Sequence, residues 1–148
     1  MKDIEASDNL WTCPECGNRF VTSNAWHSCG MYTLEDLFAS SEPVVLDLFE
    51  WLVALVGDLG EVTVIPQKTR VTTQAQVRFI SCYPRRKFLL AGFWFPRYIS
   101  SPRFHKITKY RLQAYVHDIR ITDFAQFDDE FRGWVYTAYQ VGLRRHFQ

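Results

Sequence analysis

"KFLLAGFWF", residues 87–95, carries apolar side chains at both alternating sets of positions. In an extended strand, successive side chains point to opposite faces of the sheet, so this strand needs neighbours on both of its faces. The stretch therefore predicts a central strand that is buried on both sides, and the rest of the chain is expected to be arranged around it.

The segments around this strand predict the rest of the sheet and its cover. Runs rich in β-branched and aromatic residues, separated by Pro, Ser or basic turns, fill residues 61–122: "EVTVIP", "KTRVTT", "QVRFISCYP", "FHKIT" and "RLQAYVHDI". Residues 40–60, "SSEPVVLDLFEWLVALVGDLG", and residues 128–147 have the three- and four-residue apolar spacing of helices. This order predicts an α+β fold, a mainly antiparallel sheet with a long N-terminal helix and a C-terminal helix packed on one face. The second face would be left solvated.

A metal-binding motif precedes this domain in "WTCPECGNRFVTSNAWHSCG", residues 11–30. Cys13 and Cys16 form a C-x2-C pair, and His27 and Cys29 follow at a distance that could close a tetrahedron. Zinc in structural sites takes four such ligands and keeps no open position for water or substrate. The motif therefore predicts a structural zinc ion. A redox dithiol is the alternative, but the sequence lacks the βαβ context of that motif.

These patterns divide the chain into a flexible tail at residues 1–9, a small zinc knuckle at 10–32 and an α+β domain at 33–148. The first ten residues, "MKDIEASDNL", contain no apolar core of a signal peptide. No apolar run approaches the ~20 residues that a membrane span requires. We therefore expect a cytoplasmic protein that does not enter membranes.

Charge is distributed unevenly along the chain. Residues 1–60 hold two basic and ten acidic side chains, a net of −8, whereas residues 61–122 hold twelve basic and two acidic side chains, a net of +10. The basic segment could form a surface that binds anions. Alternatively, the basic sheet could pair with the acidic helices of the same chain.

Alternation within the basic segment indicates candidate ligand-binding residues. In "KTRVTTQAQVR", residues 68–78, the polar set of positions includes Lys68, Arg70 and Arg78, and in "RLQAYVHD" it includes Arg111, Tyr115 and His117. If both segments stay extended, these side chains share a cationic face that could bind nucleic acid or a small anionic ligand. An ordinary solvated sheet face would give the same pattern.

Catalytic motifs are missing from the sequence: it contains no G-x-S-x-G, no H-E-x-x-H and no glycine-rich phosphate loop. Cys82 lies in the apolar run "FISCYP", where a buried, inert thiol is expected. We therefore favour a non-catalytic binding module. The alternatives are a hydrolase- or nuclease-like enzyme that uses the polar sheet face, and a protein-interaction module that uses the aromatic residues of the knuckle, such as Trp26.

The segments "WTCPECGNRF", "WHSCG", "YTLEDLF", "LGEVTVIPQKTRV" and "AYQVG" resemble a bacterial family known only as a domain of unknown function, number 5655. The resemblance extends from about residue 11 to residue 142. It implies a zinc-binding N-terminal unit on Cys13, Cys16, His27 and Cys29, and a main domain whose signature is the Lys-Thr segment at residues 68–70. It implies no particular activity.

Overall fold

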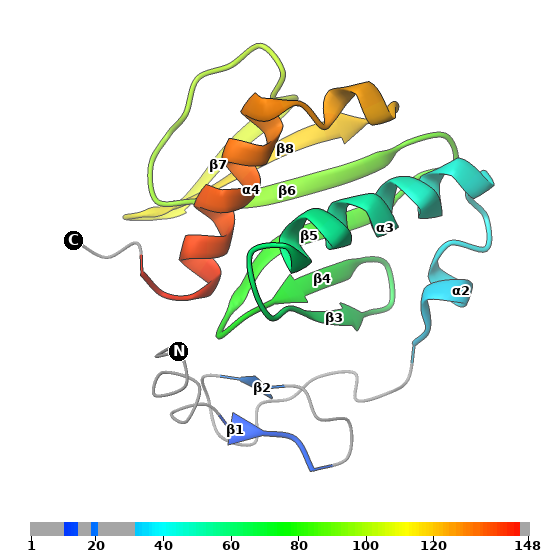
Figure 1. Cartoon of the computed structure of the whole chain (residues 1–148), viewed down its shortest axis with the longest axis horizontal. Helices are drawn as coiled ribbons and strands as arrows, with labels where there is room; N and C mark the ends of the chain where they lie inside the picture. Colours follow the sequence, from blue (N-terminus) through cyan, green and yellow to red (C-terminus); the bar gives the residue numbers. More distant parts are fainter. Residues whose placement is uncertain (1–10, 15–18, 21–31, 146–148) are drawn as a thin grey trace.

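The computed structural model describes residues 11–14, 19–20 and 32–145 (Figure 1). Its main body is a six-stranded antiparallel sheet in the order β3-β4-β5-β6-β8-β7. The strands are β3 (Thr63–Pro66), β4 (Val71–Gln74), β5 (Arg78–Pro84), β6 (Leu89–Phe95), β7 (Lys106–Arg111) and β8 (Ala114–Ile121). The strand β8 lies between β6 and β7 because the chain after β6 crosses to the sheet edge before it returns. The predicted α+β fold with an antiparallel sheet is confirmed.

β6 occupies the predicted central position, paired with β5 on one side and β8 on the other. Its side chains toward the helices are fully buried, namely Leu89, Ala91, Phe93 and Phe95. On the opposite face, Leu90 and Trp94 are only half-buried. The second face of β6 is therefore less covered than the sequence predicts, because the layer above it is a trough open to solvent.

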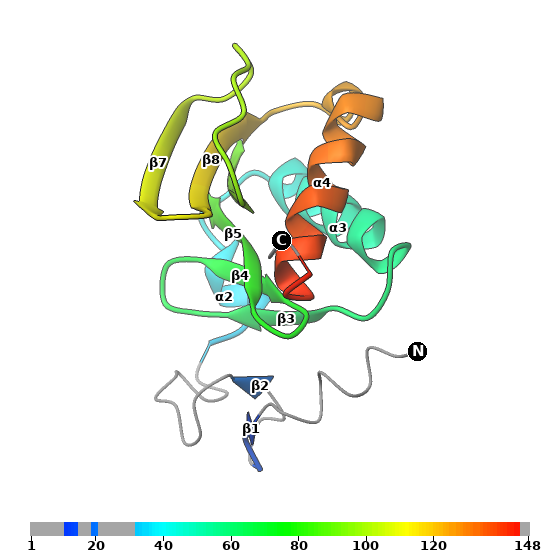
Figure 2. The ribbon, with the colours of Figure 1, turned by 90° about the vertical axis from the view of Figure 1, so that its left-hand side faces the viewer.

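Two helices cover one face of the sheet, as both perpendicular views show (Figures 1 and 2). They are α3 (Pro43–Gly57) and the C-terminal α4 (Asp129–Gly142). A short helix, α2 (Leu34–Leu37), precedes α3, and a 3-10 turn, η1 (Phe124–Gln126), precedes α4. Pro43 suits the first turn of α3, where its missing N–H costs nothing. Asp128 caps α4 by accepting a hydrogen bond from the Phe131 N–H at 3.0 Å.

The hydrophobic core lies between the helices and the sheet. Apolar residues at helical spacing on α3, such as Leu48 and Leu52, are fully buried there. From α4, the Phe131 ring meets the Phe93 ring of β6 edge to face, with ring centroids 5.4 Å apart. Burial of aromatic rings of this size contributes most of the stabilisation of such a core. Within the part of the chain that the structure describes, no helix is long and apolar enough to cross a membrane.

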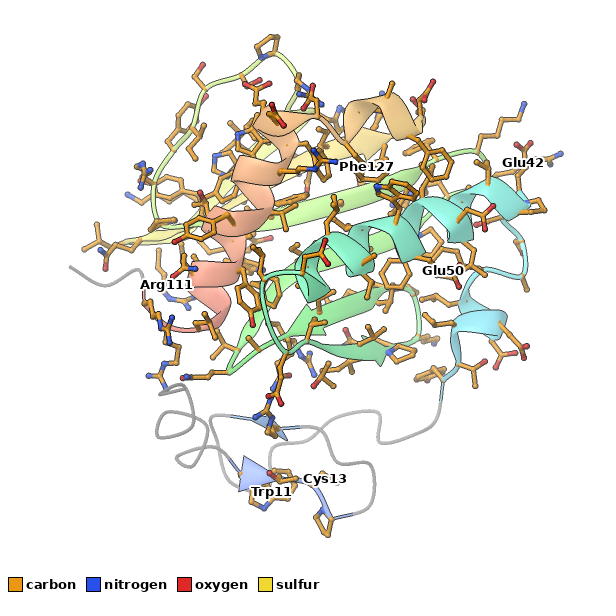
Figure 3. All side chains as sticks on the ribbon, in the orientation of Figure 1. Trp11, Cys13, Glu42, Glu50, Arg111 and Phe127 are labelled. Atoms are coloured by element: carbon orange, nitrogen blue, oxygen red, sulfur yellow. The ribbon has the colours of Figure 1, made fainter. Side chains whose placement is uncertain are left out.

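A separate two-stranded hairpin, β1 (Trp11–Thr12) and β2 (Arg19–Phe20), precedes the main body. It lies beside the β3–β4 end of the sheet, with Trp11 and Cys13 on its β1 side (Figure 3). Arg19 joins it to the sheet: its guanidinium donates to the Ala75 carbonyl at 3.3 Å, and its own carbonyl accepts from the Gln74 side chain. The hairpin is therefore hydrogen-bonded to the end of β4.

Candidate functional site: a trough on the open face of the sheet

A row of small and polar residues crosses the open face of the sheet. Strand register places Ser81, Gly92, Asp118 and Lys106 side by side on β5, β6, β8 and β7. Because Gly92 has no side chain and Ser81 has a short one, the centre of this row is low. The rows on either side carry bulky residues, so the low row becomes the floor of a trough with a volume of about 230 Å³.

Aromatic side chains form the two walls of this trough. On β6, Leu90 belongs to one wall and Trp94 to the other, and four residue steps along a strand separate their Cα atoms by ~13 Å. Tyr83 extends the first wall, and Tyr110 extends the second. The Trp94 and Tyr110 rings pack together with centroids 5.2 Å apart, and Tyr110 remains 61% exposed. An exposed aromatic surface of this kind can stack on a planar ring.

Cationic groups concentrate at the Tyr83 wall. The Arg70 guanidinium donates to the Tyr83 hydroxyl at 3.0 Å and to the Gln67 side-chain oxygen at 3.2 Å. The Arg85 guanidinium lies 5.7 Å from the centre of the Tyr83 ring. Burial lowers the pKa of Arg78, and the nearby Arg70 charge lowers it further. Arg70 and Arg85 therefore place two guanidinium groups beside the Tyr83 ring, with Arg78 near Arg70.

Asp118 is the only carboxylate among the residues that line the trough. Its Oδ1 lies over Gly92, only 2.8 Å from the point where a Cβ on residue 92 would stand. In the described part of the chain, no hydrogen bond or ion pair reaches this carboxylate. Burial raises the pKa of Asp118, and the nearby Lys106 and His105 partly oppose the rise. Among the described lining residues, the trough thus contains one carboxylate, which forms no ion pair with the cations around it.

The structure places only some of the predicted ligand-binding residues together. Arg70 lines the trough. Arg78 begins the adjacent strand after a turn at residues 75–77, so the prediction that residues 68–78 stay extended is wrong. Lys68 is exposed in the β3–β4 turn and does not line the trough. Arg111 lies at the far end of the β7–β8 hairpin (Figure 3).

Tyr115 and His117 lie on the opposite face, under the helices, instead of sharing a face with Arg111. The chain turns at residues 112–113, where Gln113 takes a positive φ of 62°, so Arg111 and His117 belong to different strands. His117 is fully buried, and its Nε2 accepts the Ile99 N–H at 2.9 Å. Burial lowers the pKa of His117, while a contact with the Tyr115 carbonyl opposes the shift. His117 therefore holds the β6–β7 connection and does not reach the trough.

The sequence patterns do not single out Trp94 and Asp118 as site residues, although both line the trough. Gly92 was an available signal, since a glycine inside an apolar strand often marks a place where a ligand or another backbone comes close. Cys82, by contrast, is buried as predicted, and its burial raises the pKa of the thiol, which favours the protonated, less reactive form.

The predicted zinc ligands fall mostly outside the described residues. Cys13 is buried and directly follows β1, whereas Cys16, His27 and Cys29 lie beyond the described ranges, as does Trp26 of the protein-interaction alternative. Within residues 11–14, 19–20 and 32–145, no group of three potential ligands could hold a metal ion. The zinc site therefore stays a prediction.

Comparison with known proteins identifies the family of the main domain. A family model described as "Domain of unknown function (DUF5655)" matches residues 34–142, a range that begins after the predicted knuckle. No curated protein and no solved structure matches the chain. Because the match covers more than half of the chain, including the whole six-stranded sheet, this chain belongs to the DUF5655 family.

Proposed function

We propose that this chain is a non-catalytic binding module whose trough binds a nucleotide unit, either free or within a single-stranded nucleic acid. One observation carries the proposal: Arg70 and Arg85 flank Tyr83 on one wall, and the Trp94–Tyr110 pair forms the other. Proteins hold single strands by combining cations for phosphate with aromatic surfaces on which bases stack. Bidentate guanidinium groups are well suited to phosphate.

Among the described residues, the cations of the trough form no ion pairs with carboxylates of the protein. Arg103 of the basic segment pairs with Asp128 and Glu130, but in the described residues no carboxylate forms an ion pair with Arg70, Arg85 or Lys106. The acidic α3 lies on the other face of the sheet (Figure 2). This arrangement argues against the alternative in which the basic sheet only pairs with the acidic helices.

The size of the trough favours a single nucleotide unit over a duplex. Its volume of about 230 Å³ is below the range of roughly 300–1,000 Å³ of pockets that enclose drug-sized ligands. A base that is already unstacked can enter such a space, whereas a base in a duplex must first be unpaired at a cost of a few kcal/mol. Single-stranded ligands are therefore expected to bind more tightly than duplexes of the same sequence.

Fluorescence anisotropy with labelled single- and double-stranded oligonucleotides across a salt series tests this function. Loss of a charge-assisted contact costs roughly 1.5–3 kcal/mol, so Arg70→Ala is expected to weaken binding by about 10- to 100-fold. Arg111→Ala removes the same charge at the hairpin end, outside the trough, and serves as the matched control. Absence of binding at low salt, or equal affinities of the Arg70 and Arg111 variants, would contradict the proposal.

An enzyme that uses the same trough is the second candidate, and Asp118 is the observation that favours it. A carboxyl group with a raised pKa in a cleft is typical of general acids and bases. Incubation of the protein with nucleotides and oligonucleotides, followed by chromatography of the products, tests for turnover. Turnover that disappears in Asp118→Asn, with binding retained, would favour the enzyme.

We further propose that Cys13, Cys16, His27 and Cys29 bind a structural zinc ion. The types and spacing of these residues support this, since four Cys and His ligands of this kind form structural zinc sites, and Cys13 is buried directly after β1. Elemental analysis of purified protein is expected to find zinc, which Cys16→Ser should remove and Cys82→Ser should not. Equal zinc content in both variants would contradict the assignment.

A further inference from the structure

The position of Asp118 in an otherwise cationic trough points to the kind of base that the site accepts. Asp118 and Lys106 are directly opposite each other on β8 and β7, yet no ion pair joins them among the described residues. Both side chains line the trough, at the end away from Arg70 and Tyr83. The trough therefore has one end suited to phosphate and another that offers an acceptor beside a cationic donor.

The Asp118 carboxylate disfavours a phosphate at this end, since two anions repel each other at short range. The ligand group at this end must instead present hydrogen-bond donors, because a carboxylate offers two acceptor oxygens and no donor when it is ionised. Two strand spacings separate β8 from β5, which places Asp118 ~10 Å from the Tyr83 strand. That separation is on the scale of the distance between the base and the phosphate of one nucleotide.

Among the common bases, guanine has the edge that matches this end. Its N1–H and its N2 amino group are adjacent donors that a carboxylate can accept in a bidentate pair, and its O6 is an acceptor next to them. Adenine and cytosine present one amino donor beside a ring acceptor, and uracil presents one N–H between two carbonyls. Lys106 stands where it can donate to O6.

We propose that the trough selects guanine, with Asp118 accepting from N1–H and the N2 amino group, Lys106 donating to O6, and Arg70 and Arg85 contacting the phosphate. This inference rests on the proposed nucleotide-binding function and adds the identity of the base. Gly92 contributes by its lack of a side chain, since a Cβ there would meet Asp118 Oδ1 and displace the carboxylate.

Calorimetric titration of the full chain with GMP, AMP, CMP, UMP and XMP (xanthosine monophosphate) tests the inference. The wild-type chain is expected to bind GMP at least ten-fold more tightly than the other four. Asp118→Asn replaces one acceptor by an amide donor and keeps the shape of the side chain. It should therefore lose GMP affinity and gain affinity for XMP, whose base carries a carbonyl at C2 where guanine has its amino group.

The outcomes separate the two proposals. Absence of binding by every mononucleotide would overturn guanine selection, and absence of binding by single-stranded oligonucleotides as well would overturn nucleotide binding itself. Binding of all five with equal affinity, or an Asp118→Asn variant that changes all affinities by the same factor, would overturn guanine selection and leave nucleotide binding in place. A purely structural role for Asp118 predicts no gain for XMP, so the exchange of preference is the decisive result.

Discussion

Replacement of Gly142 by alanine tests the closest approach of helix to sheet in this fold. A Cβ on residue 142 would stand 2.9 Å from Cγ and 3.0 Å from Cε1 of Phe79, closer than carbon atoms pack. The Phe79 ring is fully buried and packs edge to face with Tyr139 at 5.4 Å, so it has little room to turn. The helix end is also held, because the Gly142 carbonyl accepts from the backbone N–H groups of Gln76 at 2.8 Å and Val77 at 3.0 Å.

The cost follows from these contacts. Overpacking of a filled core costs about 1–3 kcal/mol, and loss of the two carbonyl hydrogen bonds, the other way to relieve the clash, costs a similar amount. The higher helix propensity of alanine returns at most ~1 kcal/mol. We therefore expect the free energy of unfolding to fall by about 1–2 kcal/mol and the Tm to fall by roughly 3–8 °C.

Gly133 provides the matched control within the same helix. A Cβ there would meet no atom within 4 Å, so Gly133→Ala should raise the free energy of unfolding by about 0.5–1 kcal/mol through helix propensity alone. Urea denaturation followed by circular dichroism measures both variants. If Gly142→Ala proved as stable as Gly133→Ala, the reasoning from the Phe79 contact would be refuted.

Three further predictions concern the site and its surroundings. Burial holds the pKa of His117 below its ordinary value of 6.5, so the unfolded chain binds a proton more readily than the folded chain. The free energy of unfolding should therefore fall as the pH drops below 6.5. Urea denaturation at about pH 7.5 and 5.5 measures this fall, which His117→Gln should reduce. Burial raises the pKa of Asp118, so the folded chain binds this proton more tightly than the unfolded chain, and the resulting stabilisation is lost as the pH rises through the folded pKa. Asp118→Asn should therefore be more stable than wild type at pH 7 but not near ~pH 3. Urea titrations of both proteins at the two pH values measure the difference. Gly92→Ala should keep its Tm within a few degrees, because only the end of the Asp118 side chain and a Val116 methyl must give way. The variant should nevertheless lose most of its nucleotide affinity in the anisotropy assay.

The elements of the fold could be predicted because their signals are local. The apolar run at residues 87–95 and the helical spacing of Leu48 and Leu52 depend only on neighbours along the chain. The short turns were harder to predict. At residues 112–113 and 75–77 the alternation of polar and apolar residues continues across the turn. The pattern therefore predicts one continuous strand where the structure has two.

The trough could not be predicted for a different reason. The alternation of side chains along β8 defines two faces but does not show which face the helices cover. Because His117 is polar, its face is predicted to be the solvated one. A backbone N–H from Ile99 satisfies the buried ring, and that contact between distant segments has no local signature. Likewise, Ser81, Gly92, Asp118 and Lys106 come together only through the register of four strands.

The place of α4 at the end of the described elements also affects how the chain is made. Synthesis from the N-terminus completes all six strands before α4 exists, so Phe93 and the other apolar residues beneath α4 have no cover while the helix is still inside the ribosome. Nascent chains with exposed apolar sheets are prone to aggregation and are bound by chaperones. The core beneath α4 is therefore closed only once residues 129–142 have been made and have packed on the sheet.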